Sequence, residues 1–132
     1  MERIMIIDSD LNQMKLLKDG LTGEYLTLGC SRGTKAIDLF NIFQPSALIL
    51  DPGTFDLNTR EFVAKVRKLP YRKNILILAL SRMTTIRQIE ESFDLGVDMI
   101  FSKPCALERI KKKLNQYFVT PAAVPSLEAS SV

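Results

Sequence analysis

The chain has 132 residues, of which 46% are hydrophobic and 25% are charged, and its formal net charge is +3. These values are ordinary for a single globular domain, and the charge is too small to indicate nucleic-acid binding by itself. Because there is no run of about 18 apolar residues and no signal peptide, we expect a cytoplasmic protein outside the membrane. The chain has no histidine, which removes the usual general base, the commonest metal ligand and a phosphohistidine relay.

Strand-like and helix-like segments alternate five times along the chain. Short apolar runs predict strands at residues 3–7, 25–28, 47–50, 75–80 and about 98–101. Apolar residues at helical spacing predict a helix after each strand, beginning near Leu11, Ala36, Phe62, Ile86 and Leu107. Asp10 is the expected N-cap of the first helix. This alternation indicates an α/β fold with a parallel sheet and helices on both faces.

The last residues change in composition. Residues 119–132 are dominated by Pro, Ala and Ser, so they are expected to form a disordered tail or the start of a linker. The predicted domain is therefore residues 1–118.

Polar side chains follow four of the predicted strands, at residues 8–10, Asp51, Ser81 and Lys103. The carboxyl ends of parallel strands meet at one edge of a sheet, where open α/β folds bind their ligands. We therefore expect two acids, a hydroxyl and an ammonium to converge there. A single Asp after a strand is more often a turn former or a helix cap, so only the whole set of polar residues indicates a functional site.

These segments together resemble the receiver domains of response regulators, and they are similar to chemotaxis and sporulation receivers. The matching pieces are Ile4–Asp10, Leu48–Asp51, Leu78–Ser81 and Gly96–Pro104, with 22 residues from Ser81 to Lys103. The resemblance covers about residues 2–118. It implies a flavodoxin-like, doubly wound sheet of five parallel strands in the order 2-1-3-4-5.

The resemblance also implies a function. Asp51 would accept a phosphoryl group from a sensor histidine kinase or a phosphotransfer protein in two-component signalling. Lys103 would pair with a phosphoryl oxygen, and Ser81 would donate a hydrogen bond to it. Mg²⁺ would be held by Asp8, Asp51 and Gly53, with Asp10 as a further candidate.

Other properties follow from the same resemblance. The Lys103–Pro104 peptide is expected to be cis. The expected partners are the phosphodonor protein, a downstream effector protein or domain, and a second copy of the chain. Direct contact with nucleic acid or a membrane is not expected, and neither is enzyme activity.

Several positions depart from the family pattern, and three of them bear directly on the expected function. Ser9 stands where a second metal-binding acid is usual, so weak Mg²⁺ binding is expected. Arg82 follows Ser81, where a small residue is usual, so it is expected to crowd the phosphate site or bias it electrostatically. Ile100 replaces an aromatic residue, and strand alternation is expected to point Phe101 to the opposite face.

These departures keep a second hypothesis open, namely a pseudo-receiver that binds partners without phosphorylation. A third hypothesis is a small flavodoxin-like phosphocarrier or nucleotide-binding enzyme. It ranks low because neither GxGxxG nor GxxxxGK[ST] is present.

Overall fold

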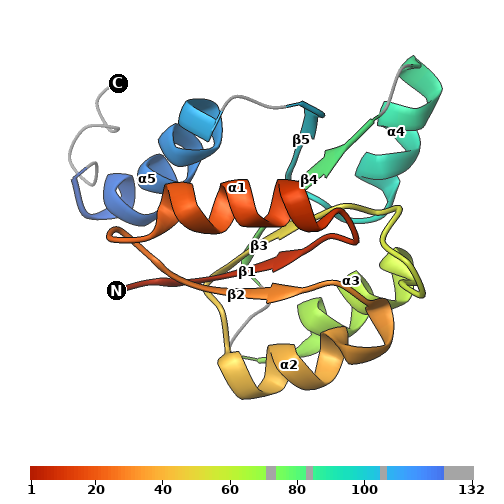
Figure 1. The fold of residues 1–132 in the computed structure, drawn as a ribbon, viewed down its shortest axis with the longest axis horizontal. Coiled ribbons are helices and arrows are strands. Elements are labelled where there is room, and N and C mark those ends of the chain that lie inside the picture. The colour runs from red at the N-terminus through yellow and green to blue at the C-terminus, as the bar shows by residue number, and fades with distance from the viewer. Residues whose placement is uncertain (71–73, 83–84, 105–106, 124–132) are drawn as a thin grey trace.

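Strands and helices alternate along the chain in the computed structural model, as the sequence predicts (Figure 1). The structure describes residues 1–70, 74–82, 85–104 and 107–123, with side chains described as far as residue 118. The strands are β1 (Arg3–Ile7), β2 (Leu26–Cys30), β3 (Ala47–Leu50), β4 (Leu76–Ser81) and β5 (Met99–Ser102). The helices are α1 (Leu11–Leu21), α2 (Ala36–Phe43), α3 (Thr59–Lys68), α4 (Ile86–Asp94) and α5 (Leu107–Ala123), and the short 3-10 turn η1 (Gly33–Lys35) precedes α2.

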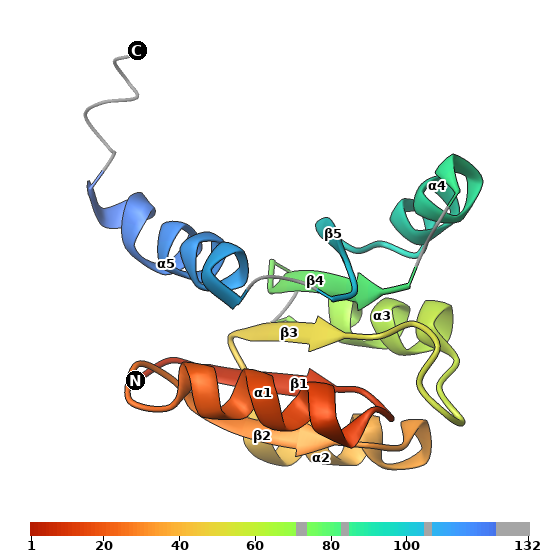
Figure 2. The same cartoon turned by 45° about the horizontal axis from the view of Figure 1, so that its top comes forward.

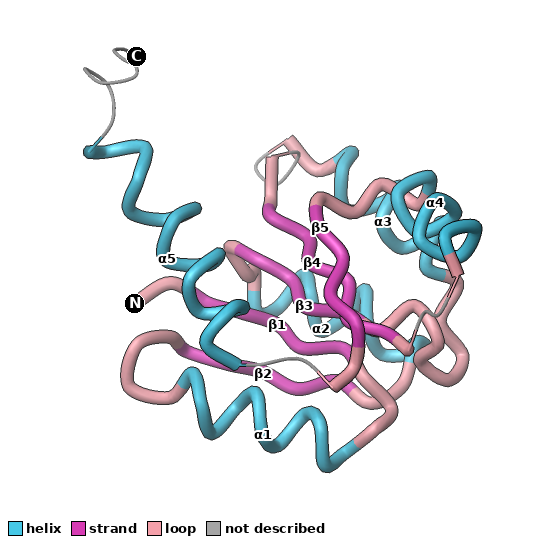
Figure 3. The backbone as a smooth tube through the Cα atoms, turned by 90° about the horizontal axis from the view of Figure 1, so that it is seen from above, coloured by secondary structure: helices cyan, strands magenta, loops and turns pink. Residues whose placement is uncertain are grey.

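The strands form one parallel sheet in the order β2-β1-β3-β4-β5, which confirms the predicted order (Figure 3). Ile7 pairs with Leu50, and Leu50 pairs with Ala79, so the carboxyl ends of the three central strands lie in register. The strand arrowheads accordingly point to the same edge of the sheet (Figure 2). Residues that follow these strands are therefore brought together.

Helices cover both faces of the sheet, as predicted. Figure 1 shows α1 and α5 on one face and α2 and α3 on the other. Successive residues of a strand contribute to opposite layers, since Ile4 and Ile6 pack with the α1/α5 side while Met5 and Ile7 pack with the α2/α3 side. Both faces are buried, which explains why the strands are apolar at nearly every position.

The second strand differs from its predicted bounds. It runs from Leu26 to Cys30 rather than over 25–28, because Gly29 and Cys30 pair with Ile6 and Ile7 of β1. Glycine is depleted in strands, so the local sequence does not indicate this extension. The fourth and fifth strands each begin and end one residue later than predicted.

The last helix, α5, continues to Ala123, beyond the domain end expected at residue 118, and the domain boundary itself stays a prediction. This continuation contains Pro121, which is strongly disfavoured inside helices, so helix propensity does not indicate it. Residues 119–123 of the expected tail belong to α5 in the structure, and residues 124–132 lie outside the described part of the chain. Among the described helices, none has the length and apolar character needed to cross a membrane.

Candidate functional site

Three charged side chains meet at the carboxyl edge of the sheet. The Nζ atom of Lys103 lies 2.8 Å from Oδ2 of Asp8 and 2.7 Å from Oδ2 of Asp51. The side chains of Lys103 and Asp8 are 5% and 4% exposed, and that of Asp51 is 16% exposed. One ammonium thus binds two carboxylates, and the cluster keeps one net negative charge. The structure brings together three of the residues that the sequence singled out.

The sheet itself positions these three residues. Asp8 and Asp51 directly follow the paired residues Ile7 and Leu50. The N–H of Asp8 donates to the Cys30 carbonyl at 3.0 Å, and the N–H of Asp51 donates to the Ile7 carbonyl at 2.9 Å. These bonds extend the hydrogen-bond ladder of the sheet by one residue at Asp8 and at Asp51. The backbone of both residues is thereby fixed to the sheet, and their side chains extend into the site.

Lys103 is held from the other side of the site. Its N–H donates to the Ser81 carbonyl at 2.9 Å, which keeps it beside β4. The Lys103–Pro104 peptide is cis, as the resemblance implied.

Both carboxylates also accept backbone hydrogen bonds. Oδ1 of Asp8 accepts from the N–H of Asp10 at 2.9 Å, and Oδ1 of Asp51 accepts from the N–H of Gly53 at 2.7 Å. Each of the four carboxylate oxygens therefore faces a donor. This arrangement holds the oxygens of Asp51 in fixed positions, which suits a carboxylate that acts as a nucleophile.

Burial has opposite effects on the acid and the base of this cluster. Desolvation raises the pKa of Asp8 above its ordinary value, although the hydrogen bond and charge of Lys103 act to lower it. Desolvation lowers the pKa of Lys103, but its bonds to Asp51 and Asp8 together outweigh that effect and raise the pKa. Lys103 is consequently a firmly protonated cation at neutral pH.

Ser9 connects loops that are far apart in the sequence. Its Oγ donates to the Ser31 carbonyl at 3.1 Å and accepts from the N–H of Phe55 at 2.7 Å. Next to it, the N–H of Gly33 donates to the Phe55 carbonyl at 2.8 Å, and the Arg32 guanidinium lies 4.9 Å from the centre of the Phe55 ring. We call these contacts of Ser9, residues 31–33 and Phe55 the loop clasp. It fixes the segment that follows Asp51.

Asp10 has a role at the helix rather than among the acids. Its Oδ1 accepts from the N–H groups of Asn12 and Gln13, each at 3.1 Å, so it is the N-cap of α1 as predicted. In the described part of the chain, no three Asp, Glu, Cys or His residues group closely enough to hold a metal ion. The carboxylates of Asp8 and Asp51 are protein groups of the kind that a hard cation prefers, and the contribution expected of the Gly53 backbone carbonyl stays a prediction.

Ser81 faces a separate hollow beside the acids. It ends β4 and, with Pro52 and Gly53, lines a cavity of about 500 Å³ between α3 and α4. The charged residues that line this cavity are Arg60, Arg82 and Glu91. The hydroxyl expected at the site thus borders the loop that follows Asp51.

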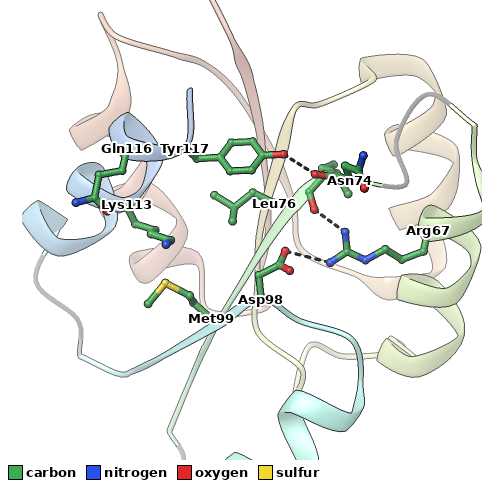
Figure 4. A pocket seen from close by; sticks show the side chains of 9 residues that line it. Arg67, Asn74, Leu76, Asp98, Met99, Lys113, Gln116 and Tyr117 are labelled. Carbon is green, nitrogen blue, oxygen red and sulfur yellow. Dashed lines mark hydrogen bonds and ion pairs between the residues drawn. The ribbon is translucent and has the colours of Figure 1, made fainter. Parts of the chain in front are cut away.

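A larger cavity of about 860 Å³ lies at the opposite edge of the sheet, between α5 and the starts of β4 and β5 (Figure 4). Its polar groups hold the fold together. Arg67 donates to the carbonyls of Ile75 and Gly96 and pairs with Asp98 at 3.0 Å, and the Tyr117 hydroxyl donates to the Asn74 carbonyl. It shares no residue with the acidic cluster, so its size does not make it the reactive site.

The loop clasp is a structural feature beside the site that the sequence did not indicate. The sequence spacing of Ser9, Ser31 and Phe55 does not indicate that they are in contact. They come close because β1, β2 and β3, the strands before their loops, are neighbours in the sheet. The sequence showed only that Ser9 departs from a family pattern.

The chain is similar to known proteins in sequence and in fold. No family model matches the chain. Sporulation initiation phosphotransferase F of Bacillus subtilis (strain 168) is 24% identical over 117 residues, which are 88% of this chain and 93% of that protein.

Solved structures of response regulators have the same fold. The chemotaxis response regulator CheY4 of Vibrio cholerae superposes with a TM-score of 0.78 at 21% identity, covering 88% of this chain and 98% of that one. The N-terminal domain of the nisin resistance regulator NsrR gives 0.75 at 25% identity, covering 87% and 96%. The phosphorylated cyanobacterial phytochrome response regulator RcpA gives 0.73 at 21% identity, covering 95% and 99%.

Proposed function

We propose that the chain, which has the fold of response-regulator receiver domains, accepts a phosphoryl group on Asp51 in two-component signalling. The observation that carries the proposal is the Lys103 ammonium bridging Asp8 and Asp51 at 2.8 and 2.7 Å. A solvated lysine or a helix-capping aspartate would not form this buried arrangement. The phosphorylated state of the similar regulator RcpA supports the same chemistry here.

The reaction is a phosphoryl transfer between two proteins. The chain has no histidine, so the donor is a phosphohistidine on a partner, either a sensor histidine kinase or a phosphotransfer protein. An Asp51 oxygen forms the new P–O bond while the P–N bond of the donor breaks, and solvent supplies the proton that the leaving imidazole takes. The protein contributes position and charge, which account for most of the catalysis in such transfers.

Lys103 and Ser81 have distinct roles in this proposal. The ammonium of Lys103 keeps at least one donor available for a phosphoryl oxygen, because it carries three and spends two on Asp8 and Asp51. Ser81 donates a hydrogen bond to the phosphoryl group and thereby senses it.

Mg²⁺ fits this site only in part. Asp8, Asp51 and the Gly53 carbonyl would hold it, and when bound it would neutralise charge on the transferring phosphoryl group. Ser9 adds no negative charge and its hydroxyl is already engaged in two hydrogen bonds, while the Asp10 carboxylate caps α1. Metal binding is therefore weak in this proposal.

The loop clasp favours a second candidate function. A pseudo-receiver presents a fixed surface to an effector protein, and a clasped loop after Asp51 provides such rigidity without phosphate. In both cases the output goes to a protein partner or a second copy of the chain, in the cytoplasm.

The experiment is treatment with acetyl phosphate and Mg²⁺, followed by intact-mass measurement. The wild type and Asp56→Asn should each gain one phosphoryl group, since Asp56 is an exposed aspartate of the same loop, and Asp51→Asn should gain none. Modification that persists in Asp51→Asn contradicts the assignment of the acceptor. No modification of the wild type at any Mg²⁺ concentration favours the pseudo-receiver.

A further inference from the structure

The acidic cluster lacks the positive charge that a phosphorylated Asp51 needs. Lys103 is a single cation for two carboxylates. A phosphoryl group replaces the one charge of Asp51 with nearly two, so the imbalance grows on phosphorylation. Ser9 is neutral and engaged in the loop clasp, so it does not help to hold a metal ion. A tightly bound metal therefore does not correct the charge imbalance. Another cation near the phosphoryl position is required.

The cavity between α3 and α4 contains such a cation. It is bordered by Gly53, whose N–H already bonds Oδ1 of Asp51 at 2.7 Å, and by Ser81. A phosphoryl group on Asp51 that accepts a hydrogen bond from Ser81 lies at the mouth of this cavity. The adjacent residue Arg82 lines the same space.

The other charged groups of this cavity have their own partners. Arg60 donates through Nη1 to the Asp94 carbonyl at 3.2 Å, which fixes it to the end of α4. Glu91 pairs with Arg87 at 3.3 Å along the exposed face of α4. Arg82 is exposed and has no ion pair or hydrogen bond with any other residue in the described part of the chain. It is the cation of this cavity that is available to an incoming anion.

We propose that Arg82 is a phosphoryl ligand, whose guanidinium binds the phosphoryl oxygens on Asp51 and reduces the need for Mg²⁺. This inference rests on the proposed function of Asp51. A planar guanidinium presents two parallel N–H donors to two phosphoryl oxygens, a bidentate geometry that an ammonium lacks, and it stays charged at every physiological pH. Arg82 therefore supplies part of the charge that the departure at Ser9 takes away.

The test compares phosphorylation with and without metal. The initial rate of Asp51 modification by phosphoramidate is measured by intact mass in EDTA and over a range of Mg²⁺ concentrations. The proteins are the wild type, Arg82→Gln, Arg82→Lys and the control Arg60→Gln, which removes a charge from the same cavity. Arg82 is exposed, so its replacement should leave the fold intact, and thermal unfolding checks this.

The expected result is a wild type that is modified in EDTA and an Arg82→Gln variant that is slower there by about ten- to a hundredfold, the loss of a hydrogen bond to a charged group. Saturating Mg²⁺ should narrow that gap, Arg82→Lys should recover part of the rate, and Arg60→Gln should match the wild type. Equal rates for the wild type and Arg82→Gln in EDTA would overturn the role of Arg82, and so would a wild type that is modified only with Mg²⁺. Either result would leave the proposed function of Asp51 standing. No modification of any protein under any condition overturns the proposed function, and Arg82 with it.

Discussion

The hydroxyl of Ser9 accepts a 2.7 Å hydrogen bond from the backbone N–H of Phe55, four residues beyond the proposed acceptor Asp51. The same hydroxyl donates to the Ser31 carbonyl at 3.1 Å. The position where similar domains carry a metal-binding acid is thus used to join three loops. A residue that looks like a loss of function in the sequence is a structural contact in the fold.

Replacing Ser9 with aspartate should strengthen metal binding and weaken the contact between the loops. Ser9→Asp adds an anionic oxygen beside Asp8 and Asp51, so Mg²⁺ affinity should rise by at least an order of magnitude, about 1.4 kcal/mol. The new carboxylate has no proton to donate to Ser31, so the free energy of unfolding should fall by about 1 kcal/mol. Amide chemical shifts during a Mg²⁺ titration measure the first effect, and urea unfolding measures the second.

The control for this change is Ser9→Ala, which removes both hydrogen bonds of the hydroxyl and adds no charge. It should lose stability without gaining Mg²⁺ affinity. If Ser9→Asp binds Mg²⁺ no more tightly than the wild type, then another group already completes the metal site.

Gly33 should be required for the loop clasp. A Cβ atom at this position would lie 2.0 Å from the Asp56 carbonyl oxygen, and that oxygen belongs to the backbone and cannot rotate away. Gly33→Ala should therefore cost roughly 1–3 kcal/mol of unfolding free energy. Gly53→Ala is the matched control, since its Cβ would meet only the Asp51 side chain, at 3.3 Å. Urea midpoints that are equal for Gly33→Ala and the wild type would show a loop free to shift.

The sequence predicted the site where local pattern and sheet topology were enough. The first and third strands have their predicted bounds because each apolar run ends at an acid that breaks the pattern, Asp8 or Asp51. The meeting of Lys103 with both acids followed from placing all three at strand ends. Asp10 was identified as an N-cap because capping depends on residues within one turn of the chain.

What the sequence did not show depends on contacts between distant segments. The second strand extends through Gly29 because β1 offers it partners, and this pairing overrides the low strand propensity of glycine. The role of Ser9 depends on Ser31 and Phe55, which come near it only after the sheet has formed. The end of α5 at Ala123 was missed because the continuation contains Pro121, a residue that is strongly disfavoured inside helices.

Removing the ammonium of Lys103 should make stability depend strongly on pH. Lys103→Met leaves two buried carboxylates unpaired, which should cost about 3–5 kcal/mol near neutral pH. The pKa of Asp8 is already raised by burial, and it should rise further once the lowering effect of Lys103 is lost. Carbon-detected NMR titration of the Asp8 carboxyl group measures this change directly.

The sign of the pH effect follows from linkage. A carboxyl group whose folded pKa lies above its unfolded value of 3.8 stabilises the fold when protonated, and that contribution is complete below pH 3.8. It is lost as pH rises through the folded pKa. The stability gap between Lys103→Met and the wild type should therefore be small in acid and widen toward neutral pH. A stability difference of constant size from acid to neutral pH would show that ionisation of Asp8 is not the reason why Lys103→Met is less stable.

The structure limits how a phosphoryl signal leaves the site. Ile100 packs with the α2/α3 side of the sheet, while Phe101 is buried on the α1/α5 side under the Arg109 guanidinium, 5.6 Å from the ring centre. The expected alternation of these two residues is confirmed. The family resemblance implies an aromatic ring at the position of Ile100, which would turn to fill the space that the hydroxyl residue leaves. Ile100 has no ring and is stiff at χ1, and Phe101 is on the wrong face to replace it.

We therefore expect phosphorylation to change the surface formed by α4, β5 and α5 only slightly. The affinity for a protein partner, or the self-association constant, should change by less than about tenfold, or 1.4 kcal/mol, between the free protein and its beryllofluoride complex at saturating Mg²⁺. A ligand that interacts equally with two states does not shift their balance. Ile100→Tyr restores a ring at the same position and should enlarge the change. A wild-type change well above tenfold would show that this chain has a working switch built from other residues.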